Sequence, residues 1–253
     1  AHTGQMTELV GISEPIEDRV AKKYETQAID LLKSNDAPKA LALCGTSPPG
    51  LHSDRIANII SSRQHGRTLV FVDSAKDILP VLQTGCVDIL KINAEEITGI
   101  AAQIDPQLGS SAETSIVDAA WQVARTLRIG VVAVTDGPSK AYLVDIQKTC
   151  AFAFDIPDLL ANRHKYLLGD CHDAAAAIDK DCEFGKLTLN PLGAGDTCSA
   201  VMLNLILDGK EAIEAFAQGL SAASASCLVP MPNCVFDKQV MMRIRKDVFV
   251  SEI

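Results

Sequence analysis

Aromatic side chains are scarce in this chain of 253 residues: they make up 4% of it, and Trp121 is the one tryptophan. The core must therefore be built mainly from alanine, leucine, isoleucine and valine. No apolar run reaches the roughly 18 residues that a membrane-spanning helix needs, so we expect no membrane partner. Basic residues are also in deficit, because 23 Lys and Arg stand against 32 Asp and Glu and give a net charge of −9. A negative surface repels a phosphate backbone, so we expect no nucleic-acid partner.

Several familiar motifs are missing as well. The eight cysteines are widely and irregularly spaced and include no Cys-x-x-Cys pair. In a chain of this length, that pattern predicts buried thiols in the cytoplasm or another reducing compartment rather than a disulfide framework. The sequence has no Walker A loop, which argues against a P-loop phosphotransferase. The dinucleotide-binding fingerprint also fails, because the third residue after Gly195 is Cys198.

What is present is a globular composition, with 47% hydrophobic and 22% charged residues, which predicts a folded chain. Short apolar segments alternate with amphipathic ones along the first half. Strands separated by helical segments of about 10–15 residues indicate parallel βαβ units, and strands that are nearly all apolar fit a sheet covered on both faces. We expect strands at residues 39–44, 67–73, 87–91 and 130–135, and helices at 16–32, 53–63, 75–82, 94–104 and 115–127.

The second half has a different pattern. Residues 141–145 and 150–156 are two strands with a short polar link, which predicts an antiparallel pair. Residues 186–190 alternate and predict one more strand, followed by a long apolar helix to about residue 207 and a second helix, rich in Ala and Ser, at 210–228. Residues 159–185 are polar and carry no strand signal. We expect them to form an inserted loop with a short helix, and loops of this length are usually functional or mobile.

The strongest local signal for chemistry is a strand, then Gly193-Ala194-Gly195-Asp196, then a helix. Glycines let backbone amides approach an anion closely, and the start of a helix adds unpaired N–H groups and a positive dipole end. Such a turn can bind a phosphate or a developing oxyanion. Asp196 in the first helical turn could take a proton from an attacking hydroxyl. The alternative is structural: an Asp or Thr at a helix start is often a cap, and glycine turns before helices are common.

Four segments then resemble, in the same order, the ribokinase-like (PfkB) carbohydrate kinases. Asn190-Pro191-Leu192-Gly193-Ala194-Gly195-Asp196-Thr197 resembles the C-terminal signature of that family. Residues 44–50 (CGTSPPG) are similar to the Pro-Pro-Gly turn of its phosphosugar kinases, residues 91–96 (KINAEE) to its Lys-Pro-Asn-x-x-Glu segment, and residues 134–137 (VTDG) to its Val-Thr-x-Gly segment. The resemblance covers nearly the whole chain and implies a single domain over residues 1–253. It implies an α/β fold, a ribokinase-like three-layer α/β/α sandwich with a mostly parallel central sheet.

The resemblance also implies roles for the residues of the Gly-Ala-Gly-Asp turn and for Thr46. Asp196 corresponds to the catalytic base, and the amides of Gly193, Ala194 and Gly195 correspond to the anion hole for the transferred phosphoryl group. Thr46 corresponds to a residue near the phosphate of a sugar-phosphate substrate. The structural alternative for Thr46 is a stiff loop that ends a strand, because two prolines fix the backbone there.

ATP and Mg²⁺ are the implied cofactors. Thr135 and Gly137 match positions near the ATP phosphates, although an ordinary turn at a strand end would look the same. Asn93 and Glu96 correspond to the pair that orders Mg²⁺ through its waters. The structural alternative is a capping box at a helix start, with Asn93 as cap and Glu96 three residues later, and both interpretations can hold at once.

The chain also departs from the family. It lacks the early Asp and the Gly-Gly-x-x-x-Asn segment that grip the sugar, and residues 2–11 resemble the last lid strand. We therefore expect the N-terminal third of the domain to be missing and the β lid to be incomplete. Either the chain is a fragment, or a homodimer or a partner chain completes the lid, or the protein no longer phosphorylates a sugar.

The resemblance implies an ATP-dependent kinase for a sugar phosphate of the fructose 1-phosphate, fructose 6-phosphate or tagatose 6-phosphate class. The alternatives are a catalytically impaired, kinase-like binding or structural subunit, and a nucleoside or vitamin kinase of the same fold.

Overall fold

The computed structural model describes residues 14–74, 76–105, 115–168, 189–229 and 235–253. Within these residues the chain forms a seven-stranded sheet whose spatial order is the same as the sequence order. The first four strands are parallel to one another, and each later strand is antiparallel to the one before it. The strands are β1 (Ala40–Cys44), β2 (Leu69–Asp73), β3 (Ile89–Asn93), β4 (Val131–Asp136), β5 (Lys140–Asp145), β6 (Cys150–Asp155) and β7 (Phe249–Glu252).

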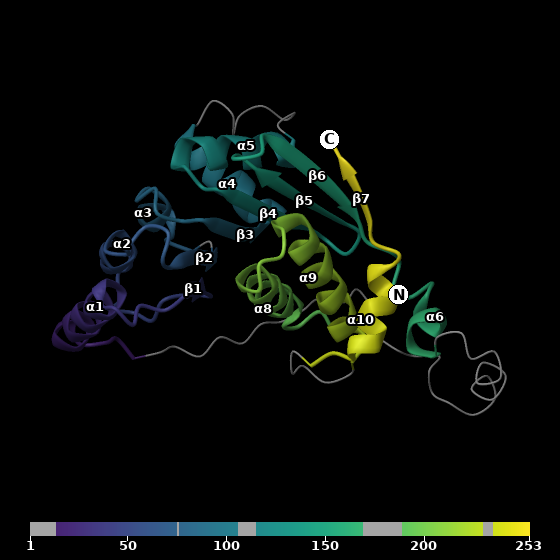
Figure 1. Ribbon diagram of the computed structural model, residues 1–253, viewed down its shortest axis with the longest axis horizontal. Helices are drawn as coiled ribbons and strands as arrows, with labels where there is room; N and C mark the ends of the chain where they lie inside the picture. The colour runs from purple at the N-terminus through teal and green to yellow at the C-terminus, as the bar shows by residue number, and fades with distance from the viewer. Residues whose placement is uncertain (1–13, 75, 106–114, 169–188, 230–234) are drawn as a thin grey trace.

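Helices connect and cover the strands (Figure 1). The predicted helix at 94–104 has the observed bounds, and the other predicted strands and helices differ mostly at their ends. The described helices are α1 (Asp18–Lys33), α2 (Ser53–Ser61), α3 (Leu79–Leu82), α4 (Ala94–Ile104), α5 (Ile116–Leu127), α6 (Arg163–Leu168), α8 (Ala194–Leu207), α9 (Ala212–Cys227) and α10 (Lys238–Arg245).

Four predictions about elements need correction or stay open. The helix expected at 75–82 is helical only over α3, because Asp77 has a positive φ of 53° and Pro80 lies in the first turn. The strand expected at 87–91 begins two residues later. Of the strand expected at 186–190, only Leu189 and Asn190 are described, and neither lies in a strand. The segment at 2–11 lies outside the described residues.

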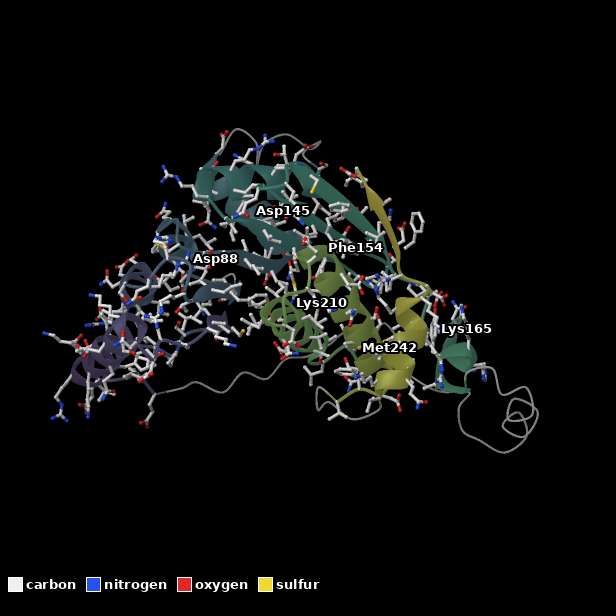
Figure 2. The ribbon with its side chains drawn as sticks, in the orientation of Figure 1. Asp88, Asp145, Phe154, Lys165, Lys210 and Met242 are labelled. Atoms are coloured by element: carbon white, nitrogen blue, oxygen red, sulfur yellow. The ribbon has the colours of Figure 1, made fainter. Side chains whose placement is uncertain are left out.

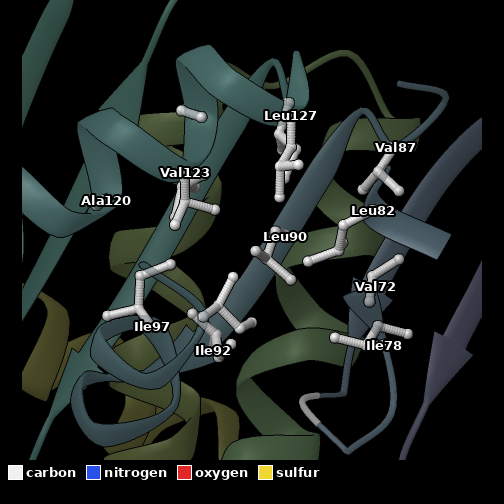
Figure 3. Packing of buried hydrophobic residues seen from close by; sticks show 14 of the residues in the cluster. Val72, Ile78, Leu82, Val87, Leu90, Ile92, Ile97, Ala120, Val123 and Leu127 are labelled. Atoms are coloured by element: carbon white, nitrogen blue, oxygen red, sulfur yellow. The ribbon is translucent and has the colours of Figure 1, made fainter. Parts of the chain in front are cut away.

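The sheet has a core on each face, because successive residues of a strand point to opposite sides. On one face, Val70 and Val72 of β2 and Leu90 and Ile92 of β3 pack against α2, α3, α4 and α5. Figure 3 shows Val72, Leu90 and Ile92 among side chains of α3, α4 and α5. On the other face, Phe71 of β2 and Ile89 of β3 belong to a second core with α8, α9 and α10. These helices gather on one side of the sheet in Figure 1. Two helical layers around a mixed sheet confirm the expected α/β/α sandwich.

Small residues let α8 and α9 approach each other closely. Ala and Ser positions of α9 are buried along its length. At Gly219, an added Cβ would lie 2.8 Å from the Cys198 carbonyl oxygen and 3.1 Å from its Sγ. Phe154 of β6, labelled in Figure 2, meets Phe216 of α9 edge to face with ring centroids 5.1 Å apart. The position of α8 over the sheet is therefore set by tight backbone contact with α9.

The other end of the sheet is formed by β1, which is the first strand in the sheet order. The helix α1 packs beside α2, where Arg55 pairs with Asp18 and with Glu25. Gly50 of the Pro-Pro-Gly turn has a φ of 89°, and a Cβ there would lie 2.2 Å from the carbonyl oxygen of Ile16. That turn is therefore fixed against the segment before α1. Among the described residues, no helix combines the length and apolar character needed to cross a membrane.

Candidate active site

The carboxyl ends of the parallel strands lie at one edge of the sheet, and several predicted site residues gather there. The register pairs Cys44 with Asp73 at the ends of β1 and β2, and Asn93 with Thr135 at the ends of β3 and β4. In open α/β sheets this edge is the usual place for a ligand. Asn93 and Thr135 are thus direct neighbours, although they are far apart in the sequence.

Asn93 and Glu96 form a capping box at the start of α4. The Glu96 N–H donates to Asn93 Oδ1 at 2.8 Å, and the Asn93 N–H donates to Glu96 Oε2 at 2.9 Å. The structural interpretation of this motif is therefore confirmed, and the metal role stays a prediction. The two side chains still fit Mg²⁺ through waters, because the capping box leaves Glu96 Oε1 outside it and this ion prefers oxygen ligands and keeps its waters. In the described part of the chain no group of three or more His, Cys, Asp or Glu could hold a metal, so other ligands would have to be water or phosphate oxygens.

The first turn of α8 carries the Gly-Ala-Gly-Asp residues. Gly193 is the N-cap with a φ of 79°, a left-handed conformation that favours glycine. The Ala194 N–H donates to the Pro191 carbonyl at 3.1 Å, and the helix continues with the Thr197 N–H donating to Gly193 at 2.9 Å. Within the described residues, the N–H groups of Gly195 and Asp196 have no backbone acceptor, and both residues are exposed. These two amides, at the positive end of the helix dipole, are therefore available to an anion.

A buried polar cluster lies directly behind this turn, and sequence reasoning did not single it out. Lys91 Nζ is 3.3 Å from both carboxylate oxygens of Asp73 and 3.3 Å from the carbonyl oxygen of Gly195. The Ser199 hydroxyl lies 2.5 Å from Asp73 Oδ2 and 3.1 Å from the same carbonyl. The signal that could have found it is a lysine inside an otherwise apolar buried strand. We call Lys91, Asp73 and Ser199 the Lys91 cluster.

An apolar cavity of about 480 Å³ begins beside this turn. One side of it is formed by Thr135, Gly137 and Pro138 at the end of β4, and another by Ala194 and Gly195. Two predicted phosphate-binding positions and two of the anion-hole positions thus line one cavity. Apolar side chains from α9 and from the segments before α6 and α8 close the rest: Ile156, Leu159, Leu189, Pro191, Leu220, Ala223 and Cys227.

Thr46 lies in a different cavity, of about 410 Å³, over the ends of β1 and β2. Its lining is more polar and includes Ser47, Ser74 and Lys76. The sheet order places β3 between the strand ends that line the two cavities. Because the Lys91 cluster joins β3 and the end of β2 to the first turn of α8, that turn lies between the Thr46 cavity and the apolar cavity.

The charges of Asp73 and Lys91 also influence the pKa of two nearby cysteine thiols. Burial raises the pKa of the Cys44 thiol, the carboxylates of Asp73 and Asp196 raise it further, and Lys91 lowers it. The Cys44 thiol is thus close to both the cluster and the predicted base. Cys198 is buried in the second core, and this burial raises the pKa of its thiol to about 12, as is typical of a structural cysteine.

The predicted insertion at 159–185 is described only to residue 168. This part holds α6, whose Tyr166 hydroxyl donates to Asp247 at 2.7 Å and whose Tyr166 carbonyl accepts from Arg243 at 2.6 Å. Lys165, labelled in Figure 2, also pairs with Asp247. The beginning of the segment is therefore anchored on α10, and its function stays a prediction.

Comparison with known proteins gives structural matches only. No protein-family model and no curated protein sequence matches the chain. Phosphofructokinase-2 of Escherichia coli, solved with substrates and products, matches with a TM-score of 0.69 and 19% identity, over 97% of this chain and 67% of that one. Ribokinase of Thermotoga maritima matches with a TM-score of 0.56 and 16% identity, over 86% of this chain and 59% of that one.

The chain thus spans about two thirds of the length of the phosphofructokinase. At this level of identity the similarity shows the arrangement of the backbone. It does not show the reaction, because one fold can carry many reactions. It agrees with the mixed sheet and its helical layers. The chain has the ribokinase-like fold of these sugar kinases.

Proposed function

We propose that the chain transfers the γ-phosphoryl group of ATP to a hydroxyl of a sugar phosphate. One observation carries this proposal: the exposed first turn of α8, with Gly195 and Asp196, lies between an apolar cavity and the more polar Thr46 cavity. Phosphoryl transfer requires a donor site, an acceptor site and an anion-stabilising group between them, with little covalent chemistry from the protein.

Asp196 is the proposed base. Its carboxylate accepts the proton of the substrate hydroxyl while the hydroxyl oxygen forms a bond to the γ-phosphorus and the bond to the β-phosphate oxygen breaks, which releases ADP. The N–H groups of Gly195 and Asp196 stabilise the charge on the transferred group. Gly193 and Ala194 shape the turn, because the Ala194 N–H already donates to Pro191.

The apolar cavity is the proposed site of the adenine, with Thr135 and Gly137 towards the phosphates. Asn93 and Glu96 would hold Mg²⁺ through waters at the neighbouring strand end. When bound, the ion would neutralise part of the charge of the phosphate oxygens. A cavity that is lined by apolar side chains with a few polar groups is typical of a site for a flat ring such as adenine.

The proposed substrate is a sugar phosphate of the fructose 1-phosphate, fructose 6-phosphate or tagatose 6-phosphate class. Thr46, Ser47 and Lys76 in the polar cavity offer hydroxyl and ammonium groups that suit a phosphate. The structurally similar phosphofructokinase-2 of Escherichia coli has been solved with fructose-6-phosphate, which supports this class. A panel of sugar phosphates, nucleosides and vitamins would separate it from the alternative of a nucleoside or vitamin kinase.

The first experiment is a calorimetric titration of the full chain with Mg·ATP, because it needs only the nucleotide site. We expect saturable binding that Gly195→Val weakens by about tenfold or more, since a branched side chain would cover the exposed amides and press on Lys91. Gly99→Val is the matched control, because Gly99 is also a helical glycine and an added Cβ there meets no atom within 4 Å. Absence of binding by a well-folded chain would instead favour a kinase-like binding or structural subunit.

The second experiment tests the base. Asp196→Asn should lower turnover by about 100-fold or more while Mg·ATP binding survives, because the amide cannot accept the proton. Asp208→Asn, at the far end of the same helix, is the control and should keep both properties. Retained turnover in Asp196→Asn would exclude the proposed role.

We further propose that a second polypeptide, either a copy of this chain or a partner, covers the β1 side and completes the lid. The exposed Tyr24 and Leu31 of α1 on this side support the proposal. The Escherichia coli phosphofructokinase-2 has been solved in a tetrameric form. Light scattering of the purified chain tests it, and a monomer that is fully active would contradict it. A cytoplasmic or otherwise reducing compartment is supported by the free thiols Cys44, Cys86, Cys150, Cys198 and Cys227.

A further inference from the structure

The Lys91 cluster joins three elements at a single point of the backbone. Lys91 comes from the middle of β3, Asp73 from the end of β2 and Ser199 from the second turn of α8. Both the Lys91 ammonium and the Ser199 hydroxyl lie within hydrogen-bond reach of the Gly195 carbonyl, at 3.3 and 3.1 Å. That carbonyl belongs to the peptide unit that ends at the N–H of Asp196. The cluster therefore holds the peptide that carries the proposed base and one of the exposed amides.

The cluster is an unusual way to stabilise a core. Side-chain exposure is 7% for Lys91 and 16% for Asp73, so the ion pair is largely removed from water. Replacing a buried ion pair with apolar side chains of similar size is often neutral or stabilising, whereas removing one partner leaves an uncompensated charge. The neighbouring positions of β3, Leu90 and Ile92, are apolar and fully buried. An apolar residue at position 91 would serve packing at least as well.

An apolar pair could fill the same space, but it could not hold the orientation of the Gly195 peptide. The Gly195 peptide can tilt, because glycine restricts the backbone less than any other residue. Lys91 donates to its carbonyl from the side of the sheet, and Asp73 fixes Lys91 while it accepts from Ser199. A tilt of this peptide would rotate the Asp196 N–H away from the anion site and move the Asp196 carboxylate. Small displacements of this kind reduce turnover strongly, because the reacting groups must be aligned.

We propose that Lys91, Asp73 and Ser199 are positioning residues that hold the Gly195–Asp196 peptide in the orientation needed for phosphoryl transfer. The inference rests on the proposed kinase function. It makes the buried ion pair a determinant of turnover rather than of folding. Nucleotide affinity should depend on it less, because the adenine is held by the apolar cavity and the anion site matters most in the transition state.

The test compares two ion pairs that each have a buried cation. Lys91→Met removes the ammonium, and Lys91→Met/Asp73→Leu replaces the whole pair with apolar side chains. The control is Arg63→Met with its partner variant Arg63→Met/Asp88→Leu, because Arg63 is equally buried and forms a two-armed pair with Asp88 at 2.5 and 3.0 Å, at the opposite end of β3. Each variant is measured for urea unfolding, kcat, KM and Mg·ATP affinity, and for hydrogen exchange at the amides of residues 197–199.

We expect Lys91→Met to lower kcat by about 100-fold, with less than about a threefold change in Mg·ATP affinity. The double variant should regain the urea midpoint but not kcat. Exchange at residues 197–199 should be faster in both Lys91 variants. The Arg63 variants should change the urea midpoint without changing kcat or this exchange. Recovery of wild-type kcat in the Lys91→Met/Asp73→Leu variant, with unchanged exchange in α8, would overturn the inference.

Two further outcomes would also bear on the inference. If wild-type chain binds no Mg·ATP and phosphorylates no sugar phosphate, the proposed function fails, and the exchange measurement alone decides whether the cluster holds the first turn of α8. If Lys91→Met does not fold, Ser199→Ala replaces it, because this change removes a hydroxyl without leaving a buried charge. Ser199→Ala should lower kcat by about three- to tenfold, in the range of one lost hydrogen bond, and an unchanged kcat would count against the inference.

Discussion

The close approach of α8 and α9 makes Gly219 a sharp test of the packing that positions the site. Replacing this glycine with alanine brings two opposing effects. Alanine favours a helix over glycine by about 1 kcal/mol. The new Cβ would lie 2.8 Å from the Cys198 carbonyl oxygen, a contact that forces the backbones apart. Inserting a methyl group into a tightly packed core costs about 1–3 kcal/mol. We therefore expect Gly219→Ala to lower the free energy of unfolding by about 0–2 kcal/mol.

A second glycine isolates the contact from the helix propensity. Gly99 lies in the middle of α4, is exposed, and has no atom within 4 Å of an added Cβ. Gly99→Ala should therefore raise the free energy of unfolding by about 1 kcal/mol. The propensity gain is common to both variants, so urea unfolding should show Gly219→Ala less stable than Gly99→Ala by about 1–3 kcal/mol. Equal stability of the two would refute the argument that α8 and α9 are in backbone contact at Gly219.

Three other perturbations test the surroundings of the site. Tyr166→Phe should lower the free energy of unfolding by about 1.5–3 kcal/mol, because Tyr166 donates to the charged Asp247; a change near zero in urea unfolding would contradict this. The hydrogen bond from Lys165, with that from Tyr166, lowers the pKa of Asp247. Its contribution is therefore present above the ordinary pKa of about 4 and is lost as the pH falls through the lowered value, so Asp247→Asn should flatten the acid limb of stability against pH. Ser115→Ala should cost about 1 kcal/mol in thermal unfolding, because Ser115 caps α5, and an unchanged midpoint would contradict that role.

Most of the fold could be predicted because it depends on local patterns. The strands alternate between the two cores residue by residue, so apolar runs such as those of β2 and β4 are visible in the sequence. The helix α3 could not be predicted correctly, since the backbone at Asp77 is left-handed without a glycine to indicate it. The strand β7 was missed because it is short and lies at the edge of the sheet, where two of its four residues are exposed.

The site could be predicted where its chemistry lies within one turn of chain. The Gly-Ala-Gly-Asp turn and the Asn93–Glu96 box are local motifs, although their metal and phosphate roles remain predictions. Which amides of the turn are available could not be predicted, because the bond from the Ala194 N–H to Pro191 depends on the path of the loop. The two cavities also depend on non-local packing, as with Thr135, which lines one cavity with the first turn of α8 only in the folded chain.

The Lys91 cluster shows how much of a buried polar cluster can be predicted from the sequences of its strands. Side chains alternate along β3, so a lysine between Leu90 and Ile92 must enter the core opposite theirs, where an unpaired charge is too costly to persist. An acidic partner on a neighbouring strand therefore follows from the sequence, and Asp73 at the end of β2 is in the right place. The third member does not follow. Ser199 reaches Asp73 because Gly219 of α9 allows α8 to pack closely against α9. The small residues of the two helices permit such packing, but their sequences do not give the distance between the helices.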